Sequence, residues 1–377
     1  MKTWMLMPDS FKGTMSSQEI CDVMKTQILR HVPQAEVFSI PVADGGEGSV
    51  DCFLTAMGGQ RIETTVQGPF GDPIQAYYGI VSEHTAIIEM AACAGLPLVG
   101  DQANPEKTTT YGVGQLILDA VARGCTKIIV GLGGSCTNDG GTGAAAACGV
   151  RFLDENGREF VPVGGTLKRI AAVETQTIDT RLENVEIIAM CDIDNPLCGP
   201  QGAAAVFGPQ KGADAEMVTR LDQGLQHLSC IMHSQTGKDQ KNTPGAGAAG
   251  GMGYGMLAFF KAALQMGIET VLDTVGFESL AQRADIILTG EGRMDSQSLR
   301  GKVVMGIARR AKPFNVPVVA VVGDIGDDIQ AAYDQGVTGI FSINRVAKDF
   351  DKVKSRSKSD LALTMDNLVR FCQSMGL

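Results

Sequence analysis

Seven acidic side chains come soon after apolar segments of the sequence, in positions where an α/β protein places its ligand-binding loops. They are Asp9, Asp44, Asp139, Asp192, Asp194, Glu291 and Asp295. Ligands of open α/β sheets bind beyond the carboxyl ends of the strands. Aspartate is also a common turn and N-cap residue, so each position taken alone has a structural explanation. Several converging carboxylates, however, are typical of a site for a divalent cation such as Mg²⁺.

Glycine-rich segments accompany these carboxylates. The chain has 47 glycines among 377 residues, about 12% against a usual 7% or so, and they cluster between apolar segments. A helix start lined by glycines offers backbone N–H groups and a positive dipole end to a phosphate. The candidate phosphate- or nucleotide-binding residues are Gly133, Gly134, Ser135, Thr137, Asn138, Asp139, Gly245, Gly247, Gly250 and Gly251. Phosphate loops and Mg²⁺ together indicate phosphoryl transfer from a nucleotide.

The second glycine segment also matches the pattern G-x-G-x-x-G, at residues 245–250. In a dinucleotide-binding fold this motif follows a buried strand, whereas here the polar residues 241–244 (KNTP) precede it. An NAD-dependent hydroxyacid dehydrogenase is therefore a weaker alternative, and glycines that only permit close helix packing are another. A P-loop enzyme is excluded, because Val303 follows Gly301-Lys302 and no G-x-x-x-x-G-K-[ST] exists.

Basic residues are few in these loops. Lys12, Lys211 and Arg293 are the cations that could compensate an anionic substrate or a nucleotide in a chain of net charge −10. Each of them alone is more often a solvated loop cation. Cys136 lies in the first glycine segment with no histidine in its motif. We therefore interpret it as a buried small residue and expect no thiol mechanism.

Composition restricts the class of protein further. The net charge of −10 argues against nucleic-acid and membrane-surface partners. The ten cysteines form no C-x-x-C, and the four histidines show no zinc-ligand spacing. The absence of a run of 18 apolar residues argues against a transmembrane helix. The free thiols, and an N-terminal apolar stretch cut by Pro8, lead us to expect a cytoplasmic protein.

The elements that position these residues alternate between strand and helix at both ends of the chain. The expected strands are residues 3–7, 35–42, 127–132, 185–190, 285–289, 316–322 and 339–343. Residues 60–90 alternate apolar and polar positions between turns, which predicts antiparallel hairpins. Ser16 and Glu19 form a capping box for a helix after the first strand. The polar residues 234–244 are the predicted boundary of a middle region inserted into a doubly wound domain.

Five blocks of sequence resemble the bacterial glycerate kinase family. They are residues 9–13 (DSFKG), 43–48 (ADGGEG), 131–141 (GLGGSCTNDGG), 244–251 (PGAGAAGG) and 289–297 (TGEGRMDSQ). The resemblance implies ATP-dependent phosphorylation of D-glycerate, usually at the 2-hydroxyl to give 2-phosphoglycerate. It also implies a flavodoxin-like, doubly wound parallel-sheet domain interrupted by a second α/β domain. We expect domains at residues 1–60 with 244–377 and at residues 61–243, with the active site in the cleft between them.

The residues receive roles on this basis. Asp192 is the first choice for the base that accepts the hydroxyl proton, Asp44 is the second, and Lys12 joins them as a catalytic residue. The expected ligands of Mg²⁺ are Asp192, Glu291 and Asp295. The expected substrate-binding residues are Asp9, Ser10, Lys12, Arg293 and Asp295. The sequence does not separate the two roles of Asp192.

ATP is the expected co-substrate, and the expected partners are small molecules. A non-catalytic glycerate-binding sensor is an alternative from another class, against which the absence of a DNA-binding basic patch already argues. The regiochemistry, the nucleotide preference, the oligomeric state (a homo-oligomer included) and the pathway stay open at this point.

Overall fold

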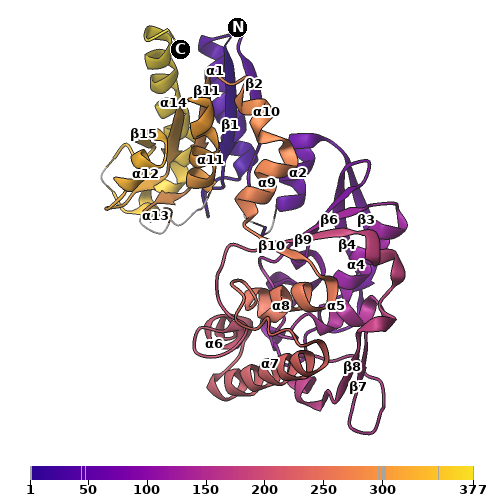
Figure 1. Cartoon of the computed structure of the whole chain (residues 1–377). Coiled ribbons are helices and arrows are strands. Elements are labelled where there is room, and N and C mark those ends of the chain that lie inside the picture. The colour runs from indigo at the N-terminus through magenta and orange to yellow at the C-terminus, as the bar shows by residue number, and fades with distance from the viewer. Residues whose placement is uncertain are drawn as a thin grey trace. The chain divides into compact units, whose positions relative to one another are not determined.

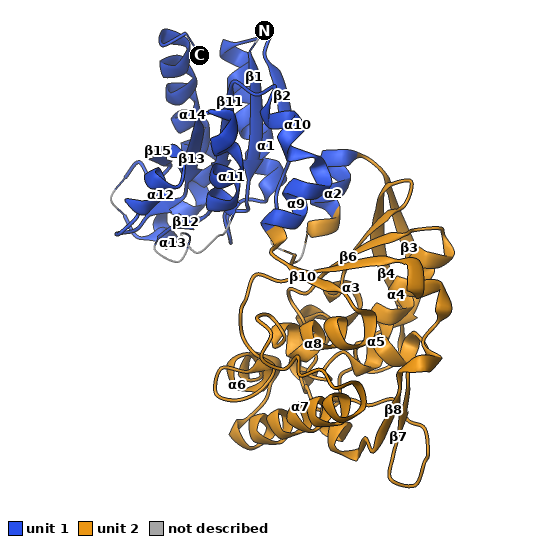
Figure 2. Ribbon diagram, in the orientation of Figure 1, with its two compact units in different colours: residues 1–44, 51–57, 268–377 blue, residues 45–50, 58–267 orange. Residues whose placement is uncertain are grey.

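The chain forms two compact units in a computed structural model (Figure 1). The structure describes residues 2–43, 45, 46, 48–295, 298, 303–346 and 348–376. Unit 1 consists of residues 1–44, 51–57 and 268–377, and unit 2 of residues 45–50 and 58–267 (Figure 2). Each unit contains a sheet of its own.

The sheet of unit 1 has five parallel strands. They are β1 (Thr3–Pro8), β2 (Glu36–Ser39), β11 (Ile286–Gly290), β13 (Val318–Val322) and β15 (Val337–Ser342). Their spatial order is β2-β1-β11-β13-β15. Numbered along the chain, this order is 2-1-3-4-5, which is the flavodoxin-like arrangement. The predicted fold class is therefore confirmed, and the order reverses between β1 and β11.

Helices cover both faces of this sheet (Figure 1). Helices α1 (Ser17–His31) and α14 (Ser357–Ser374) pack together and share a core cluster with Trp4 and Leu6 of β1. The alternate residues Met5 and Met7 are also fully buried, so they face the opposite layer. There α11 (Val303–Ala311) contacts β11 and β13. The predicted Ser16–Glu19 capping box begins α1 and is confirmed.

Shorter elements complete unit 1. They are α2 (Ser49–Met57, whose first two residues belong to unit 2), α9 (Gly267–Val275, whose first residue does), α10 (Phe277–Ala281), α12 (Ala331–Asp334), α13 (Phe350–Val353), β12 (Arg293–Met294) and β14 (Asp324–Ile325). The strands β12 and β14 pair with each other as a separate two-stranded ribbon. This ribbon follows the carboxyl ends of β11 and β13, and so it extends the edge of the sheet where ligands are expected.

The sheet of unit 2 is mixed, with the order β10-β9-β6-β5-β4-β3. Its strands are β3 (Gln60–Gln67), β4 (Pro73–Ser82), β5 (Thr85–Glu89), β6 (Lys127–Gly131), β9 (Glu186–Met190) and β10 (Ala263–Gln265). The first three pair antiparallel, as the alternation in residues 60–90 predicts. From β5 to β10 every pair is parallel, so four carboxyl ends lie along one edge.

Among the described residues, six α-helices and a small antiparallel strand pair also belong to unit 2. They are α3 (Ala91–Ala94), α4 (Tyr111–Ala122), α5 (Thr142–Ala147), α6 (Ala203–Phe207), α7 (Ala215–Thr236), α8 (Ala248–Phe260), β7 (Arg151–Leu153) and β8 (Ala172–Glu174). We expected the chain to return to unit 1 at residue 244, and it does not. It returns at residue 268, because β10 pairs with β9 and α8 packs on α5 and α6. The polar residues 234–244 end α7 and form a loop within unit 2.

Candidate functional site

The carboxyl ends of β1 and β11 bring the first group of predicted site residues together. The Asp9 N–H donates to the Gly290 carbonyl oxygen at 2.8 Å, and the Asp9 Oδ1 accepts from the Ser10 N–H at 2.6 Å. A Cβ placed on Gly292 would lie 3.5 Å from the Lys12 backbone nitrogen. The loops after β1 and β11 therefore lie side by side where the strand order reverses, which is where flavodoxin-like sheets bind their ligands.

Lys12 stands on a tight turn at this edge. Phe11 is buried and pairs with Met15, and the Thr14 N–H donates to the Phe11 carbonyl oxygen at 2.8 Å. These contacts fix the backbone on both sides of Lys12, while its own residue is exposed. The turn thus fixes the backbone of an exposed lysine at this edge of the sheet.

The ribbon of β12 and β14 carries the second group. The Gly323 N–H donates to the Glu291 carbonyl oxygen at 3.1 Å, and the Glu291 side chain is buried. Arg293 is 64% exposed, and its Nε lies 3.7 Å from Asp295 Oδ2. An exposed ion pair of this kind contributes little to stability. The Arg293 guanidinium can therefore turn to an anionic ligand at low cost.

In unit 2, the loop after β6 forms the third group, residues 133–141. Its Asp139 is fully buried, and its carboxylate accepts four hydrogen bonds. The donors are Thr110 N–H (2.8 Å), Thr110 Oγ1 (2.8 Å), Gly143 N–H (3.3 Å) and Gly141 N–H (3.1 Å). Burial raises the pKa of Asp139, and these hydrogen bonds oppose the rise. Asp139 therefore holds the loop in its conformation through hydrogen bonds in the interior of unit 2.

Only the beginning of this loop faces solvent. Gly134 is exposed, with φ 74°, whereas Ser135, Thr137 and Asn138 are buried. The Gly133 N–H already donates to the Gly45 carbonyl oxygen at 3.0 Å. The Thr137 hydroxyl and both polar atoms of the Asn138 amide have no hydrogen-bond partner among the described residues. Buried polar groups are normally paired, so these groups fit a loop that takes up phosphate oxygens or water.

Cys136 behaves as expected from the sequence. It is buried, and burial raises the pKa of its thiol to about 12. A thiol with this pKa is protonated at neutral pH and is a poor nucleophile.

The second glycine segment, residues 245–251, packs against the first. Gly250 has φ 69°, and a Cβ there would lie 1.9 Å from the Thr137 carbonyl oxygen. The Gly140 N–H donates to the Gly250 carbonyl oxygen at 3.1 Å. Residues 241–247 form turns and no strand. This arrangement lacks the buried strand of a dinucleotide fingerprint and matches the close-packing interpretation. Direct phosphate contacts from Gly245, Gly247, Gly250 and Gly251 stay a prediction.

Asp192 stands at the carboxyl edge of unit 2, directly beyond β9. Its Oδ1 accepts from the Gly267 N–H, the first residue of α9, at 2.7 Å. The Asp192 side chain is exposed, so it can also meet a ligand. This hydrogen bond to the first residue of α9 gives Asp192 a structural role, which competes with its predicted catalytic role.

The predicted metal ligands do not lie in one unit. Asp192 belongs to unit 2, and Glu291 and Asp295 belong to unit 1. Within the described ranges, no group of three His, Cys, Asp or Glu side chains could hold a metal ion. Asp44, the second candidate for the base, lies outside the described residues. The fit of Mg²⁺ to this set is thus a prediction.

Two charged residues of unit 2 have positions that the sequence does not reveal. Glu89 ends β5, is buried, and accepts the Val50 N–H at 2.7 Å. A glutamate that ends an apolar run follows the pattern of the other carboxylates, but residues 60–90 were interpreted only as hairpins. Lys211 is buried beneath the loop after β6, although the sequence predicts a loop cation in contact with solvent or with an anionic ligand. Burial of a single charge depends on tertiary packing and leaves no mark in a local pattern.

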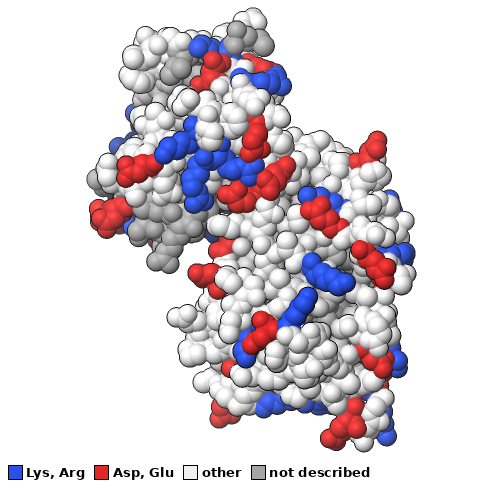
Figure 3. All heavy atoms as spheres, viewed as in Figure 1, with Lys and Arg blue, Asp and Glu red and all other residues white. Residues whose placement is uncertain are grey.

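One face of the surface carries charges of both signs. On the face drawn in Figure 3, Lys and Arg are interspersed with Asp and Glu. No helix within the described residues combines the length and the apolar character that crossing a membrane needs.

The fold and these loops define an α/β protein that presents carboxylates, cations and glycine-rich backbone at the carboxyl edges of two sheets. This is the architecture in which anionic ligands and phosphates are bound. A sequence model of the glycerate kinase family matches residues 4–373. The chain belongs to the glycerate kinase family, which is a family of kinases.

Named relatives agree with this assignment. A protein of Bacillus subtilis strain 168 named glycerate kinase is 46% identical over 338 residues, covering 89% of this chain and 88% of the relative. A protein of Escherichia coli K12 named glycerate 2-kinase is 41% identical, covering 89% of each chain. A crystal structure from Salmonella typhimurium LT2, provisionally named glycerate kinase 2, superposes with a TM-score of 0.89 at 36% identity. It covers 100% of this chain and 99% of that one.

Proposed function

We propose that this protein transfers the γ-phosphoryl group of ATP to the 2-hydroxyl of D-glycerate, giving 2-phosphoglycerate and ADP. One observation carries the proposal. In a member of the glycerate kinase family, two exposed cations, Lys12 and Arg293, lie on adjoining loops where the strand order of a flavodoxin-like sheet reverses. Cations there suit a small carboxylate substrate.

The residues of unit 1 take the substrate in this proposal. Lys12 and Arg293 bind the glycerate carboxylate, and Arg293 can leave its weak surface pair with Asp295 to do so. On the loop after β1, the Asp9 carboxylate accepts hydrogen bonds from the glycerate hydroxyl groups, and the Ser10 hydroxyl donates to them. Fixing both ends of a three-carbon acid holds one hydroxyl in line for attack.

The residues of unit 2 take the nucleotide. Gly134 offers exposed backbone, and the same loop holds the buried polar groups of Thr137 and Asn138, which have no hydrogen-bond partner among the described residues. Donors fixed before the reaction stabilise the charge that develops on the transferring group without reorganising.

The transfer itself needs a proton acceptor. The 2-hydroxyl oxygen attacks the γ-phosphorus, the bond from that phosphorus to the β,γ-bridging oxygen breaks, and ADP leaves. The hydroxyl proton passes to the Asp192 carboxylate, or to Asp44 as the second choice. For Mg²⁺ we keep Asp192, Glu291 and Asp295 as candidate ligands, because Mg²⁺ prefers carboxylate oxygens. When bound, the ion would neutralise phosphate charge.

The proposal is tested by measuring ADP release with Mg²⁺ and ATP across D-glycerate, L-glycerate, lactate and tartronate. ³¹P NMR of the product distinguishes 2-phosphoglycerate from 3-phosphoglycerate. Purified Asp192→Asn protein is the control for a contaminating kinase. We expect turnover that requires D-glycerate and yields the 2-phosphate.

Other outcomes identify the alternatives. Glycerate-dependent absorbance at 340 nm with NAD⁺ would favour a dehydrogenase. Glycerate binding in calorimetry without turnover with any nucleoside triphosphate would favour a sensor. Formation of 3-phosphoglycerate would refute the regiochemistry and leave the kinase activity in place.

A further inference from the structure

Lys211 is a lysine in the interior of unit 2. It ends the short turn Pro209–Lys211, just before α7, and is 2% exposed. Its Nζ donates to Ser135 Oγ at 2.8 Å and to the Thr137 carbonyl oxygen at 2.7 Å. Both acceptors belong to the loop after β6, so one amine ties two distant parts of the chain together.

Burying the positive charge of Lys211 costs desolvation free energy. Burial lowers the pKa of Lys211 to about 8, while the nearby Cys136 and Asp139 act in the opposite direction. Cys136 stays protonated in this range. A methionine of similar length would fill the same space without a desolvation cost. Costly local features of this kind are most often found at functional sites.

The amine acts at the point where the loop changes from exposed to buried. Gly134 faces solvent, the adjacent Ser135 is held by Lys211, and Thr137 is held through its carbonyl oxygen. The third N–H of the amine, the Thr137 hydroxyl and the Asn138 amide have no hydrogen-bond partner in the described parts of the chain. The loop thus contains buried polar groups without a partner among the described residues, three and four positions after its exposed glycine.

We infer that Lys211 is a positioning residue for the phosphate-binding loop. Acting through Ser135 and Thr137, it holds residues 133–139 in the shape in which Gly134 and its neighbours receive the phosphate oxygens of the nucleotide. This inference rests on the proposed function. It concerns nucleotide binding in unit 2 and leaves glycerate binding to unit 1.

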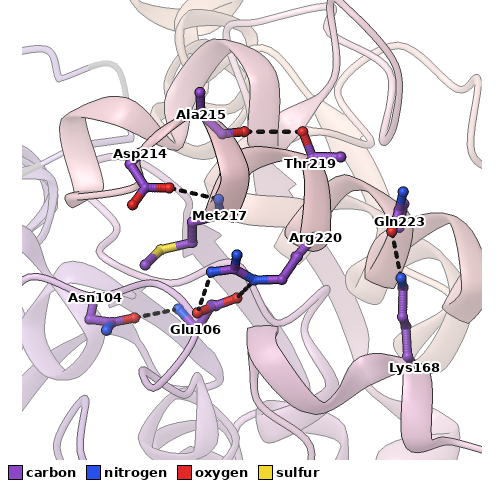
Figure 4. Close-up of polar contacts among 9 residues, drawn as sticks. All are labelled: Asn104, Glu106, Lys168, Asp214, Ala215, Met217, Thr219, Arg220 and Gln223. Carbon is purple, nitrogen blue, oxygen red and sulfur yellow. Dashed lines mark hydrogen bonds and ion pairs between the residues drawn. The ribbon is translucent and has the colours of Figure 1, made fainter.

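The test compares Lys211→Met with the control Lys168→Met in the whole protein. Lys168 lies on the turn Gly164–Arg169 of the same unit, and its exposed amine donates to the Gln223 side chain (Figure 4). We expect Lys211→Met to raise the KM for ATP at least tenfold while the KM for glycerate changes less than twofold. Hydrogen exchange of the peptide 133–141 rises in the same variant. Lys168→Met leaves all three unchanged.

The outcomes distinguish failure of the proposed function from failure of the positioning role of Lys211. If the wild-type protein shows no glycerate-dependent turnover, the proposed function fails. If it turns over and the KM for ATP in folded Lys211→Met stays within twofold of wild type, only the positioning role is overturned, even where the melting temperature falls. A merely structural lysine would give that second result.

A pH profile covers the case in which Lys211→Met does not fold. The terminal phosphate of ATP is already ionised above its pKa of about 6. Between pH 7 and 9.5 the wild-type KM for ATP should rise as Lys211 loses its positive charge, because the neutral amine has only two N–H groups and its bonds to Ser135 and Thr137 are no longer charge-assisted. Lys168→Met should show the same rise. A KM for ATP that is flat over this range overturns the inference.

Discussion

The two sheet edges use similar residues in opposite ways. At the edge of unit 1, the exposed Lys12 lies on an anchored turn and the exposed Arg293 begins strand β12. At the edge of unit 2, Asp139, Lys211 and Asn138 are buried with the loop that they shape. Exposed groups can reach a ligand and add little to stability. Buried groups are costly to desolvate, so removing one changes the shape and stability of the loop. Charge type alone therefore does not tell a binding residue from a scaffold residue.

The largest effect is expected for Asp139→Ala. The substitution leaves the donors on Thr110, Gly141 and Gly143 buried without their acceptor. We expect a loss of about 3–5 kcal/mol in the free energy of unfolding, measured by urea titration with circular dichroism. Glu155→Ala, an exposed residue of the same unit, should change it by less than about 0.5 kcal/mol. Equal losses in the free energy of unfolding for the two variants would contradict the contrast between buried and exposed charged residues.

Asp192→Asn should have the next largest effect, on catalysis. The amide keeps an Oδ1 that can accept from the Gly267 N–H, so the start of α9 is preserved while the charge is lost. We expect kcat to fall at least a hundredfold, about 2.7 kcal/mol, with an unchanged melting temperature. Intact turnover with a lower melting temperature would make Asp192 a helix-capping residue and direct attention to Asp44 as the base.

Stability should depend on pH through Lys211. Its pKa is about 8 in the folded protein and about 10.5 in the unfolded chain, so the unfolded chain binds more protons between these values. Stability contributed by this site therefore rises as the pH increases from 8 towards 10.5. Relative to Lys211→Met, the wild-type protein should gain on the order of 2 kcal/mol by pH 10, measured by urea unfolding. A constant difference between the two proteins would show that the pKa of Lys211 is not lowered.

Much of the fold is predictable from the sequence because its signals are local. The apolar runs before residues 9 and 291 predict β1 and β11, and the Ser16–Glu19 pair predicts the start of α1. The three-residue strand β10 has no local signal, since it exists through pairing with β9. For this reason the expected boundary at residue 244 differs from the observed return at residue 268.

The candidate site is less predictable than the fold. Sequence spacing predicts that Asp9, Lys12 and Glu291 lie at one edge of the sheet, because the ends of parallel strands lie together. It does not distinguish Lys12 from Lys211, which are both loop lysines next to glycine. Packing places the first in solvent and the second in the interior. Burial of this kind is a property of the assembled unit.

Lys12→Ala tests the exposed side of the comparison. If the amine binds the glycerate carboxylate, kcat/KM should fall at least about thirtyfold, about 2 kcal/mol, with the free energy of unfolding unchanged. Lys25→Ala on the exposed face of α1 is the matched control and should leave kcat/KM unchanged. Activity of Lys12→Ala within twofold of wild type would remove Lys12 from the site.

The smallest effect is expected at an exposed pair of unit 2. Arg220 on α7 donates to both carboxylate oxygens of Glu106, at 2.8 and 3.2 Å (Figure 4). The backbone of Glu106 is held independently, since its N–H donates to Asn104 Oδ1 and its carbonyl oxygen accepts from the Gly165 N–H. Arg220→Gln should therefore cost less than about 1 kcal/mol, and the cost should shrink further in 1 M salt. Urea unfolding at two salt concentrations measures it, and the KM for ATP should stay unchanged. A loss comparable to that of Asp139→Ala would mean that surface charges also shape this unit, and the contrast with the buried residues under the loop would not hold.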